Sequence, residues 1–566
     1  MKRLRLLLVL VAATLAAEQP TLVLIPGSFN GPEVFDEFKR HLGPGPTLIV
    51  ELPLREKNPT VEGFADHVLR SIGHLKRFYV GGHSIGGMVA VEIAGRAPRG
   101  LLGVISMEGW THHEVQAQAF DGDKITTLTP DQVASRESMR QRILSRITQA
   151  EASAFAAAWR KWNGLPVLQS THIPVLEIWG DRGRPRPART LLRIPERDNI
   201  DLVWIAGSPH QVLLHSPRET ALAVDRFLEA NMYAARPMGK LNGTLTTIFR
   251  ATDHRHGFNM HPYIAWHAGR FWAMWSTNRV RDLQSGQYVR FATSADGRAW
   301  SAPEALTPSE EGFRTFARGF WIRDGELIAL AARDEAVRPL FGPGLTLLGY
   351  RWNPVRRRFD SPIVIAADSI NNFPPRRLPN GHWLMSRRDH RMQVSMLEGG
   401  IASPSDWRVR PIPPSGTALD EPEWWTAANG DTHLLFRDGN RSRRLYRSIN
   451  FSPPIRTNFP DAMSKFNSLR LSDGTYAMAH NPSTDGVRIP LALSLSEDGV
   501  VFDRTYLLRD EPTMYRYSGK DPGYRGYHYP QLLERNGRLY VIHSENMEDI
   551  QLLDLPVPRA APRMRK

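Results

Sequence analysis

The sequence predicts two domains of different class, a doubly wound α/β domain followed by an all-β propeller of six or seven blades. Residues 20 to about 232 alternate short apolar runs with helix-like segments, which is typical of a parallel sheet flanked by helices. After Leu241 the pattern changes to short aromatic strands, and Gly-containing turns recur about every fifty residues. A hairpin that repeats at this period indicates a β-propeller. The chain of 566 residues is also too long for one hydrophobic core.

The first domain is predicted to span residues 18–232. Its expected strands are residues 21–25, 47–52, 78–80, 101–107, 175–179 and 201–206. Residues 129–163, rich in Ala, Arg, Gln and Glu, predict two helices inserted between the fourth and fifth strands. We expect them to form a helical lid over about residues 110–172. Residues 233–243 contain Ala, Pro and Gly and predict a linker to the propeller at 244–566.

The first residues are typical of a secretory signal peptide. Lys2, Arg3 and Arg5 precede an apolar run that ends in small residues. We predict cleavage after Ala17, which would remove residues 1–17. The apolar run is too short to span a membrane. The mature protein is therefore expected to be secreted or periplasmic, with no membrane segment.

The composition excludes several classes of function. The chain has no cysteine, which excludes disulfides, thiol catalysis and Cys-ligated metal. The formal net charge of +14 favours an acidic partner. Arginines are scattered through both halves without the interleaved aromatic residues of nucleic-acid modules. We therefore expect no nucleic-acid partner, and an acidic polysaccharide remains the candidate.

One segment of the first domain predicts a nucleophile. Residues 82–86, Gly-His-Ser-Ile-Gly, follow an apolar run and precede a small-residue segment, which predicts a strand, a sharp turn and a helix. In such a turn the central hydroxyl stands clear of the backbone, and the flanking glycines leave it accessible. Ser84 is therefore the candidate nucleophile.

On these motifs the first domain resembles the α/β-hydrolase family over its whole length. The resemblance implies a serine hydrolase of the esterase type that uses no cofactor. It places the oxyanion donors on the backbone N–H groups of Ser28 and Ile85, and it assigns the general base to His210, which follows the last strand. His112, His113 and Glu114 lack a further ligand at suitable spacing, so no metal site is predicted.

Two carboxylates are candidates for the acid that orients His210. Asp181 follows the fifth strand, where the family places its acid, and Ser84, Asp181, His210 is the family's chain order. Glu108 follows the strand after the nucleophile helix and is the alternative. Either carboxylate can accept the Nδ1 proton of the imidazole, and we place Asp181 first.

The second domain resembles sialidase-like propellers of the BNR or Asp-box type. Residues 294–300 and 496–502 have the Ser-x-Asp-Gly-x-x-aromatic pattern of an Asp-box, in which Asp and Gly shape a hairpin. These boxes are scaffold and identify the fold without implying an activity.

Parts of the propeller also resemble known sites. Tyr529 and Arg488 match the sialidase nucleophile and one carboxylate-binding arginine, but Met260 stands where the first sialidase arginine is expected. Sialidase activity is therefore not expected. The segment that begins at His261 resembles the propellers of ulvan lyases and rhamnosyl-glucuronate rhamnosidases, which act on uronic sugars. The candidate propeller site comprises His254, His256, His261, Arg488, His528 and Tyr529.

The two halves together predict a secreted serine hydrolase, a carboxylesterase acting on acylated polysaccharide, joined to a propeller that binds or cleaves glycans. One alternative is a glycosidase or polysaccharide lyase whose active site lies in the propeller. The other is a catalytically inactive glycan-binding protein.

Overall fold

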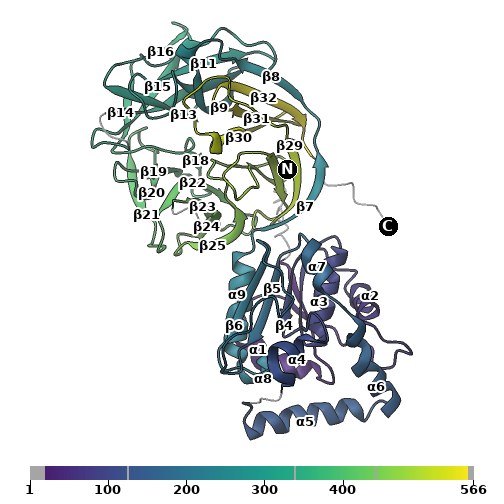
Figure 1. Cartoon of the computed structure of the whole chain (residues 1–566). Helices are drawn as coiled ribbons and strands as arrows, with labels where there is room; N and C mark the ends of the chain where they lie inside the picture. Colours follow the sequence, from purple (N-terminus) through teal and green to yellow (C-terminus); the bar gives the residue numbers. More distant parts are fainter. Residues whose placement is uncertain (1–18, 124–126, 337–339, 440–442, 559–566) are drawn as a thin grey trace, which may run out of the picture.

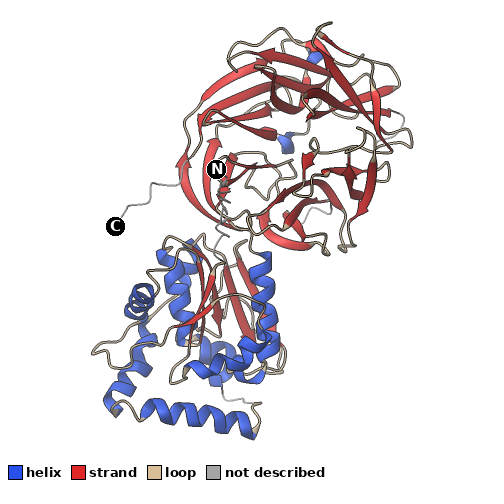
Figure 2. Cartoon of the chain, turned by 180° about the vertical axis from the view of Figure 1, so that it is seen from behind, coloured by secondary structure: helices blue, strands red, loops and turns tan. Residues whose placement is uncertain are grey.

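The computed structural model describes residues 19–123, 127–336, 340–439 and 443–558 and consists of two stacked domains (Figure 1). The predicted signal peptide, residues 1–17, lies outside the described residues. Helices are concentrated in the first domain, whereas the second is built of strands with a few short 3-10 turns (Figure 2). No helix among the described residues is long and apolar enough to cross a membrane.

The first domain contains a six-stranded sheet in which every neighbouring pair is parallel. The order is β2-β1-β3-β4-β5-β6. The strands are β1 (Thr21–Ile25), β2 (Thr47–Ile49), β3 (Phe78–His83), β4 (Leu101–Met107), β5 (Val175–Gly180) and β6 (Ile200–Ile205). This confirms the predicted doubly wound fold.

Helices cover both faces of this sheet because successive strand residues point to opposite sides. In β1, Val23 packs with the helices on one face and Leu24 with those on the other. The helices around the sheet are α1 (Asp36–His41), α2 (Val61–Ser71), α3 (Ile85–Arg96), α7 (Leu165–Ser170), α8 (Val212–His215) and α9 (Pro217–Ala230). Phe64 of α2 lies in the first core and Phe227 of α9 in the second.

Between β4 and β5 the chain forms the helices of the predicted lid. They are α4 (Val115–Phe120), α5 (Pro130–Leu144) and α6 (Gln149–Ala157). Thr129 and Thr148 each begin a helix with a reciprocal capping box, which satisfies exposed backbone N–H groups. In Figure 1, α5 lies at the end of the domain farthest from the propeller.

The second domain is a propeller of six blades, which settles the choice between six and seven. Its strands, blade by blade, are β9 (Phe258–His267), β10 (Arg270–Asn278), β11 (Tyr288–Ser294) and β12 (Glu304–Ala305); β13 (Phe313–Arg323), β14 (Glu326–Glu335), β15 (Thr346–Asn353), β16 (Arg358–Phe359) and β17 (Ile363–Ala367); β18 (Arg376–Arg377), β19 (Trp383–Arg388), β20 (Val394–Gly399) and β21 (Trp407–Pro411); β22 (Leu419–Thr426), β23 (Thr432–Asp438), β24 (Arg444–Ile449) and β25 (Ile455–Pro460); β26 (Asn467–Arg470), β27 (Tyr476–His480), β28 (Leu491–Ser496) and β29 (Phe502–Arg509); and β30 (Tyr527–Arg535), β31 (Arg538–Glu545) and β32 (Asp549–Pro556). The ring closes where β8 (Thr244–Phe249) pairs with β32.

The segment predicted as a linker, residues 233–243, is instead mostly strand β7 (Tyr233–Lys240). It runs parallel to β29 and adds a fifth strand to that blade. Ala234 is buried there among hydrophobic residues of both domains. The Ala, Pro and Gly content suggested a flexible connection, but pairing with an exposed sheet edge satisfies the backbone hydrogen bonds of this segment.

The domains meet through buried polar contacts at the amino ends of the sheet strands. Arg77, just before β3, forms an ion pair with Asp498 of the second Asp-box, and each side chain is 9% exposed. Asn458 accepts hydrogen bonds from the backbone N–H groups of Met232 and Tyr233, each at 2.9 Å. The carboxyl ends of the strands, where ligands bind in open α/β sheets, therefore point away from this interface.

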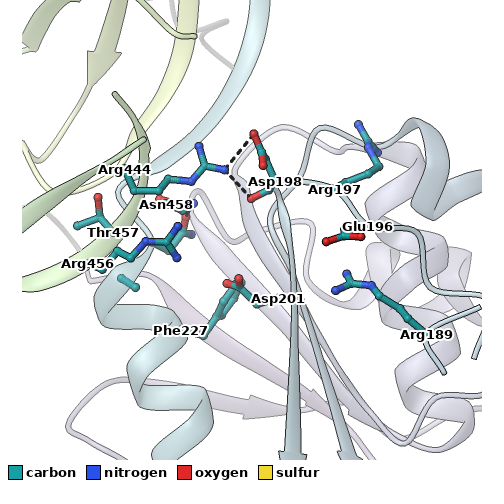
Figure 3. A pocket seen from close by; sticks show the side chains of 12 residues that line it. Arg189, Glu196, Arg197, Asp198, Asp201, Phe227, Arg444, Arg456, Thr457 and Asn458 are labelled. Atoms are coloured by element: carbon teal, nitrogen blue, oxygen red, sulfur yellow. Dashed lines mark hydrogen bonds and ion pairs between the residues drawn. The ribbon is translucent and has the colours of Figure 1, made fainter. Parts of the chain in front are cut away.

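A cleft of about 320 Å³ lies at the same interface (Figure 3). Two propeller arginines face two aspartates of the first domain across this cleft. Arg444 contacts Asp198 at 3.2 Å, and Arg456 faces Asp201. Burial raises the pKa of Asp201, while Arg456 and Arg444 lower it. Side chains of opposite charge from the two domains therefore face one another along the contact.

The Arg77–Asp498 pair is expected to stabilise the two-domain arrangement. Arg77→Met leaves the Asp498 carboxylate buried without its cation, which should lower the free energy of unfolding by about 3 to 5 kcal/mol. Urea denaturation measures this loss. Arg40→Met removes an exposed ion pair to Glu37 and should cost about 1 kcal/mol or less. Equal losses in the two variants would contradict the role of Arg77.

Candidate functional site

Ser84 lies in the strand–turn–helix that the sequence predicts. It connects β3 to α3 with φ 54° and ψ −119°, a conformation that non-glycine residues rarely adopt. The turn is tight: a Cβ atom on Gly86 would lie 2.3 Å from the carbonyl oxygen of Ile25. The glycine therefore allows α3 to begin directly against the end of β1, with the Ser84 side chain at the edge of the sheet.

The loop that carries Ser28 packs against this turn. A Cβ atom on Gly27 would lie 2.8 Å from Nδ1 of His83, the residue before Ser84. Ile85 is the first residue of α3, so its backbone N–H has no acceptor within the helix. The assignment of the Ser28 and Ile85 N–H groups as oxyanion donors stays a prediction that this placement favours.

The carboxylate that contacts His210 belongs to Glu108. Its Oε2 lies 3.1 Å from Nδ1 of His210, and Glu108 is fully buried at the end of β4. Its backbone has φ 56°, which turns the side chain out of the strand direction. The backbone N–H of Gly180, at the end of β5, donates to Oε1 at 2.6 Å. The ends of two neighbouring strands thus hold this carboxylate in place.

Arg182 is the second partner of Glu108, and sequence analysis did not identify it. Its two terminal nitrogens donate to the two carboxylate oxygens at 2.6 and 2.7 Å. The guanidinium also lies 3.9 Å from the ring centre of Phe120, at the end of lid helix α4. Burial opposes ionisation of Glu108, but Arg182 and His210 outweigh it and lower the pKa of this carboxyl. Glu108 therefore remains a carboxylate.

Asp181, the acid placed first by the sequence, has a different position. Its Oδ1 accepts hydrogen bonds from the backbone N–H groups of Gly207 at 2.7 Å and Gly183 at 3.0 Å. These bonds close its own turn and fix the loop that leads to His210. The preference for Asp181 is therefore corrected to Glu108. The fifth strand ends as expected, but backbone donors rather than the imidazole occupy the Asp181 carboxylate.

Two aromatic residues position the His210 ring. Trp110 stacks on it with a centroid distance of 5.2 Å. Nε2 of His83 lies 2.8 Å from the carbonyl oxygen of His210, which can only accept, so His83 donates. Burial, with a smaller contribution from His210, lowers the pKa of His83 to about 3. His83 is therefore neutral and fixes the backbone that carries the imidazole.

One group of His, Asp and Glu side chains among the described residues is close enough to share a metal ion: His112, His113 and Glu114. The group lies at the start of the lid, and Glu114 forms an ion pair with Arg193. That ion pair occupies the only carboxylate of the group.

In the propeller, four inner strands carry a β-bulge at the same position. In each bulge two residues oppose one on the next strand. The bulged pairs are His261-Pro262, Arg318-Gly319, Glu421-Pro422 and Tyr529-Pro530. Because a bulge redirects a side chain out of the regular alternation, the first residue of each pair turns towards the middle of the ring. We call these four residues and the side chains around them the propeller centre.

Three side chains from other parts of the chain surround the Tyr529 ring at the propeller centre. The His261 ring lies 5.3 Å from the Tyr529 ring, the Arg488 guanidinium 5.3 Å and the Lys465 Nζ 5.0 Å. Burial and the charge of Glu421 raise the pKa of Tyr529. Burial, Arg318 and Lys465 hold the pKa of His261 well below its usual range, so this imidazole is neutral.

The structure brings four of the six predicted propeller residues together. His261, Arg488, His528 and Tyr529 meet at the centre, where Arg488 contacts Nδ1 of His528. His254 and His256 do not join them, because they form a short 3-10 turn before β9. The His254 ring packs on Tyr517, and His256 contacts Asp253. Closeness in sequence to His261 was therefore misleading.

The sequence prediction missed several charged residues at the propeller centre, among them Arg318, Glu421, Arg437 and Lys465. Glu421 forms an ion pair with Arg437. One signal was available, because Glu421-Pro422 repeats the pattern of His261-Pro262 and Tyr529-Pro530, a functional side chain followed by proline. The other three residues have no such signature.

Comparison with protein families gives two matches. Residues 22–224 match the alpha/beta hydrolase family, and residues 348–541 match the BNR repeat-like domain. The first domain is therefore an α/β-hydrolase domain, and the second is a six-bladed propeller that contains a BNR repeat-like domain. A search of curated proteins found none that matches the chain.

Solved structures resemble each half separately. A sialidase is 19% identical with a TM-score of 0.43; the match covers 58% of this chain and spans only 35% of the sialidase. A mutant of NanB sialidase from Streptococcus pneumoniae is 10% identical over 55% of this chain and 70% of its own, with a TM-score of 0.42. The enol-lactonase from Burkholderia xenovorans LB400 is 16% identical over 37% of this chain and 92% of its own, with a TM-score of 0.31.

Proposed function

We propose that the N-terminal domain hydrolyses esters through an acyl-enzyme, with Ser84 as nucleophile, His210 as general base and Glu108 as the residue that orients His210. The observation that carries this proposal is the 3.1 Å contact between Glu108 and Nδ1 of His210. It lies at the same sheet edge as the strained turn of Ser84. A nucleophile, an imidazole and an ionised carboxylate in this relation are typical of serine hydrolases.

In the proposed reaction Nε2 of His210 takes the proton of the Ser84 hydroxyl as its oxygen attacks the ester carbonyl. Negative charge develops on the carbonyl oxygen, where the N–H groups of Ser28 and Ile85 would stabilise it. The imidazolium is stabilised by Glu108 and then protonates the leaving alcohol. Water, activated by His210, releases the acid from Ser84 in the second half of the reaction.

A cavity lies between the Ser28 loop and the lid, and its walls include Phe29, Ile143 and Phe155. Neither Ser84 nor His210 lines this cavity, so it sets no limit on the size of the acyl group. We propose acylated polysaccharides as substrates, hydrolysed outside the cytoplasm after removal of the signal peptide.

Ser84→Ala is expected to abolish labelling by a fluorophosphonate probe and hydrolysis of p-nitrophenyl acetate. The thermal unfolding midpoint should stay nearly unchanged, because the hydroxyl lies at the edge of the sheet and leaves no cavity. Labelling of the full-length protein, read by mass spectrometry of the modified peptide, tests the assignment. Undiminished hydrolysis by the variant would place the nucleophile elsewhere.

Glu108→Gln is expected to lower kcat by about three to four orders of magnitude, because the amide favours the wrong tautomer of His210. Asp181→Asn should have a much smaller effect, since its carboxylate contacts two backbone N–H groups and Arg186 and not the imidazole. Glu108→Gln also leaves Arg182 buried without a carboxylate, so the double variant Glu108→Gln/Arg182→Met serves as a folding control. A larger loss from Asp181→Asn would restore the assignment made from the sequence.

A second candidate function is recognition or cleavage of an acidic glycan at the propeller centre. The supporting observation is that Tyr529 lies within about 5 Å of a neutral imidazole and two basic side chains, His261, Arg488 and Lys465. Nε2 of His261 lies 3.5 Å from Asp282. An arginine that neutralises a uronate and an imidazole that takes its acidic proton would suit β-elimination, and a glycosidase remains the alternative.

Arg488→Ala is expected to weaken binding of oligogalacturonate to the full-length protein by about 1.5 to 3 kcal/mol, the range for hydrogen bonds to charged groups. Isothermal titration calorimetry at two salt concentrations measures the loss and its ionic character. A neutral β-glucan oligosaccharide should not bind. His254→Ala, which lies outside the propeller centre, should leave affinity unchanged. Equal affinity in wild type and Arg488→Ala would contradict this role.

A further inference from the structure

Most cations at the propeller centre have an identified partner. Arg437 forms an ion pair with Glu421, and Arg388 forms one with Asp420. Arg488 donates to the carbonyl oxygen of Met463 at 2.6 Å. These contacts leave Arg318 and Lys465 as the basic side chains whose position needs a separate explanation.

Arg318 is buried with unpartnered N–H groups. It is 2% exposed, and its Nε and one terminal nitrogen have no hydrogen-bond partner. It contacts the ring of Phe316 at 5.4 Å and forms a hydrogen bond with Tyr263, and the Asp282 carboxylate faces it without forming an ion pair. Buried N–H groups without acceptors destabilise the fold. An oxyanion ligand would supply the missing oxygens.

Lys465 lies beside Arg318 and is also a buried basic side chain without an ion pair in the described part of the chain. It is 2% exposed, and its Nζ donates to Oη of Tyr263 at 3.1 Å. Tyr263 in turn donates to the carbonyl oxygen of Asn372. Tyr263 therefore holds the two basic groups next to each other. The Asp282 carboxylate faces both of them, without an ion pair to either among the described residues.

The Arg318–Lys465 pair is separate from Arg488. Arg318 comes from the inner strand of the second blade, whereas Arg488 precedes β28 in the fifth, on the opposite side of a six-membered ring. Lys465, 5.0 Å from the Tyr529 ring, lies between the two positions. One anionic group at Arg488 would leave the unpartnered N–H groups of Arg318 without an acceptor.

We propose that the propeller centre binds a saccharide with two anionic groups, one at Arg488 and a second at Arg318 and Lys465. This inference rests on the proposed recognition of acidic glycans and extends it to saccharides with two negative charges. The second group is an oxyanion, either a sulfate ester or a second uronate. Several oxygens on one centre can accept from Nε and a terminal nitrogen of Arg318 and from Nζ of Lys465 together.

Two ligand pairs that differ by a single charge test this proposal. The first pair is the chondroitin disaccharide without sulfate and with one sulfate, and the second is digalacturonate with one carboxylate methylated and with both free. We expect the doubly charged member of at least one pair to bind about tenfold more tightly to the full-length protein in calorimetry. A gain in affinity within the first pair identifies the second anionic group as a sulfate ester. A gain within the second pair identifies it as a uronate.

Arg318→Met should remove this gain and leave binding of the singly charged member unchanged. Its melting temperature should equal or exceed that of the wild type, because buried N–H groups without acceptors have been removed. A purely structural arginine would instead lower it. Arg318→Lys keeps the charge and should retain part of the gain. Arg408→Met, which removes an exposed arginine on β21, is the matched control and should change nothing.

Proton uptake at Lys465 on ligand binding provides an independent test. Burial and the Arg318 guanidinium lower the pKa of Lys465 well below its usual range, and Arg388, Glu421 and Asp282 also face it. An anion beside Nζ would favour the ammonium form, so binding of the doubly charged ligand should take up a proton. The calorimetric enthalpy should then depend on the ionisation enthalpy of the buffer, and Lys465→Met should abolish that dependence.

Three results would overturn the proposal. If the singly charged ligands bind but neither pair shows a gain, the two-anion inference fails while acidic-glycan recognition stands. If no charged ligand binds, both fail. A gain that survives Arg318→Met would also contradict it, because the second group would then lie elsewhere.

Discussion

A carboxylate that is buried away from water needs hydrogen-bond donors or cations around it. This requirement shapes the candidate sites of both domains. Glu108 is fully buried, and its oxygens accept from Arg182, from the backbone of Gly180 and from His210. Glu421 is buried in the propeller and is paired with Arg437. An unpartnered buried carboxylate would cost several kcal/mol. The surrounding strands must therefore end where these donors can reach.

In the hydrolase domain this requirement links the lid to the proposed active site. Arg182 contacts Glu108 with its donors and Phe120 with its flat face. Phe120 also stacks on Trp179, and Trp110 packs against both Phe120 and His210. A displacement of α4 would thus disturb the group that keeps Glu108 ionised. The lid is part of the electrostatic environment of the imidazole as well as a cover for it.

Local chemistry made much of this structure predictable. The Ser84 turn follows from two glycines between a strand and a helix, and the propeller from repeated hairpins. The choice between Glu108 and Asp181 could not be made from the sequence, because both follow buried strands. Only the positions of Gly183 and Gly207 show that backbone donors occupy Asp181. The same limit applies to Arg318 and Lys465, which reach the propeller centre from distant parts of the chain, and to β7, whose pairing depends on an edge in a remote blade.

The pairing of β8 with β32 gives the chain a fixed order of assembly during synthesis. β8 is made directly after the hydrolase domain, but its partner is among the last described segments of the chain. Until then β8 presents an unpaired edge that any extended chain can join. Asp498 and β29 are also made late, so the hydrolase domain leaves the ribosome well before its docking surface exists. We therefore expect the nascent chain to be most vulnerable to aggregation while the ring remains open, and truncation near its carboxyl end to prolong that state.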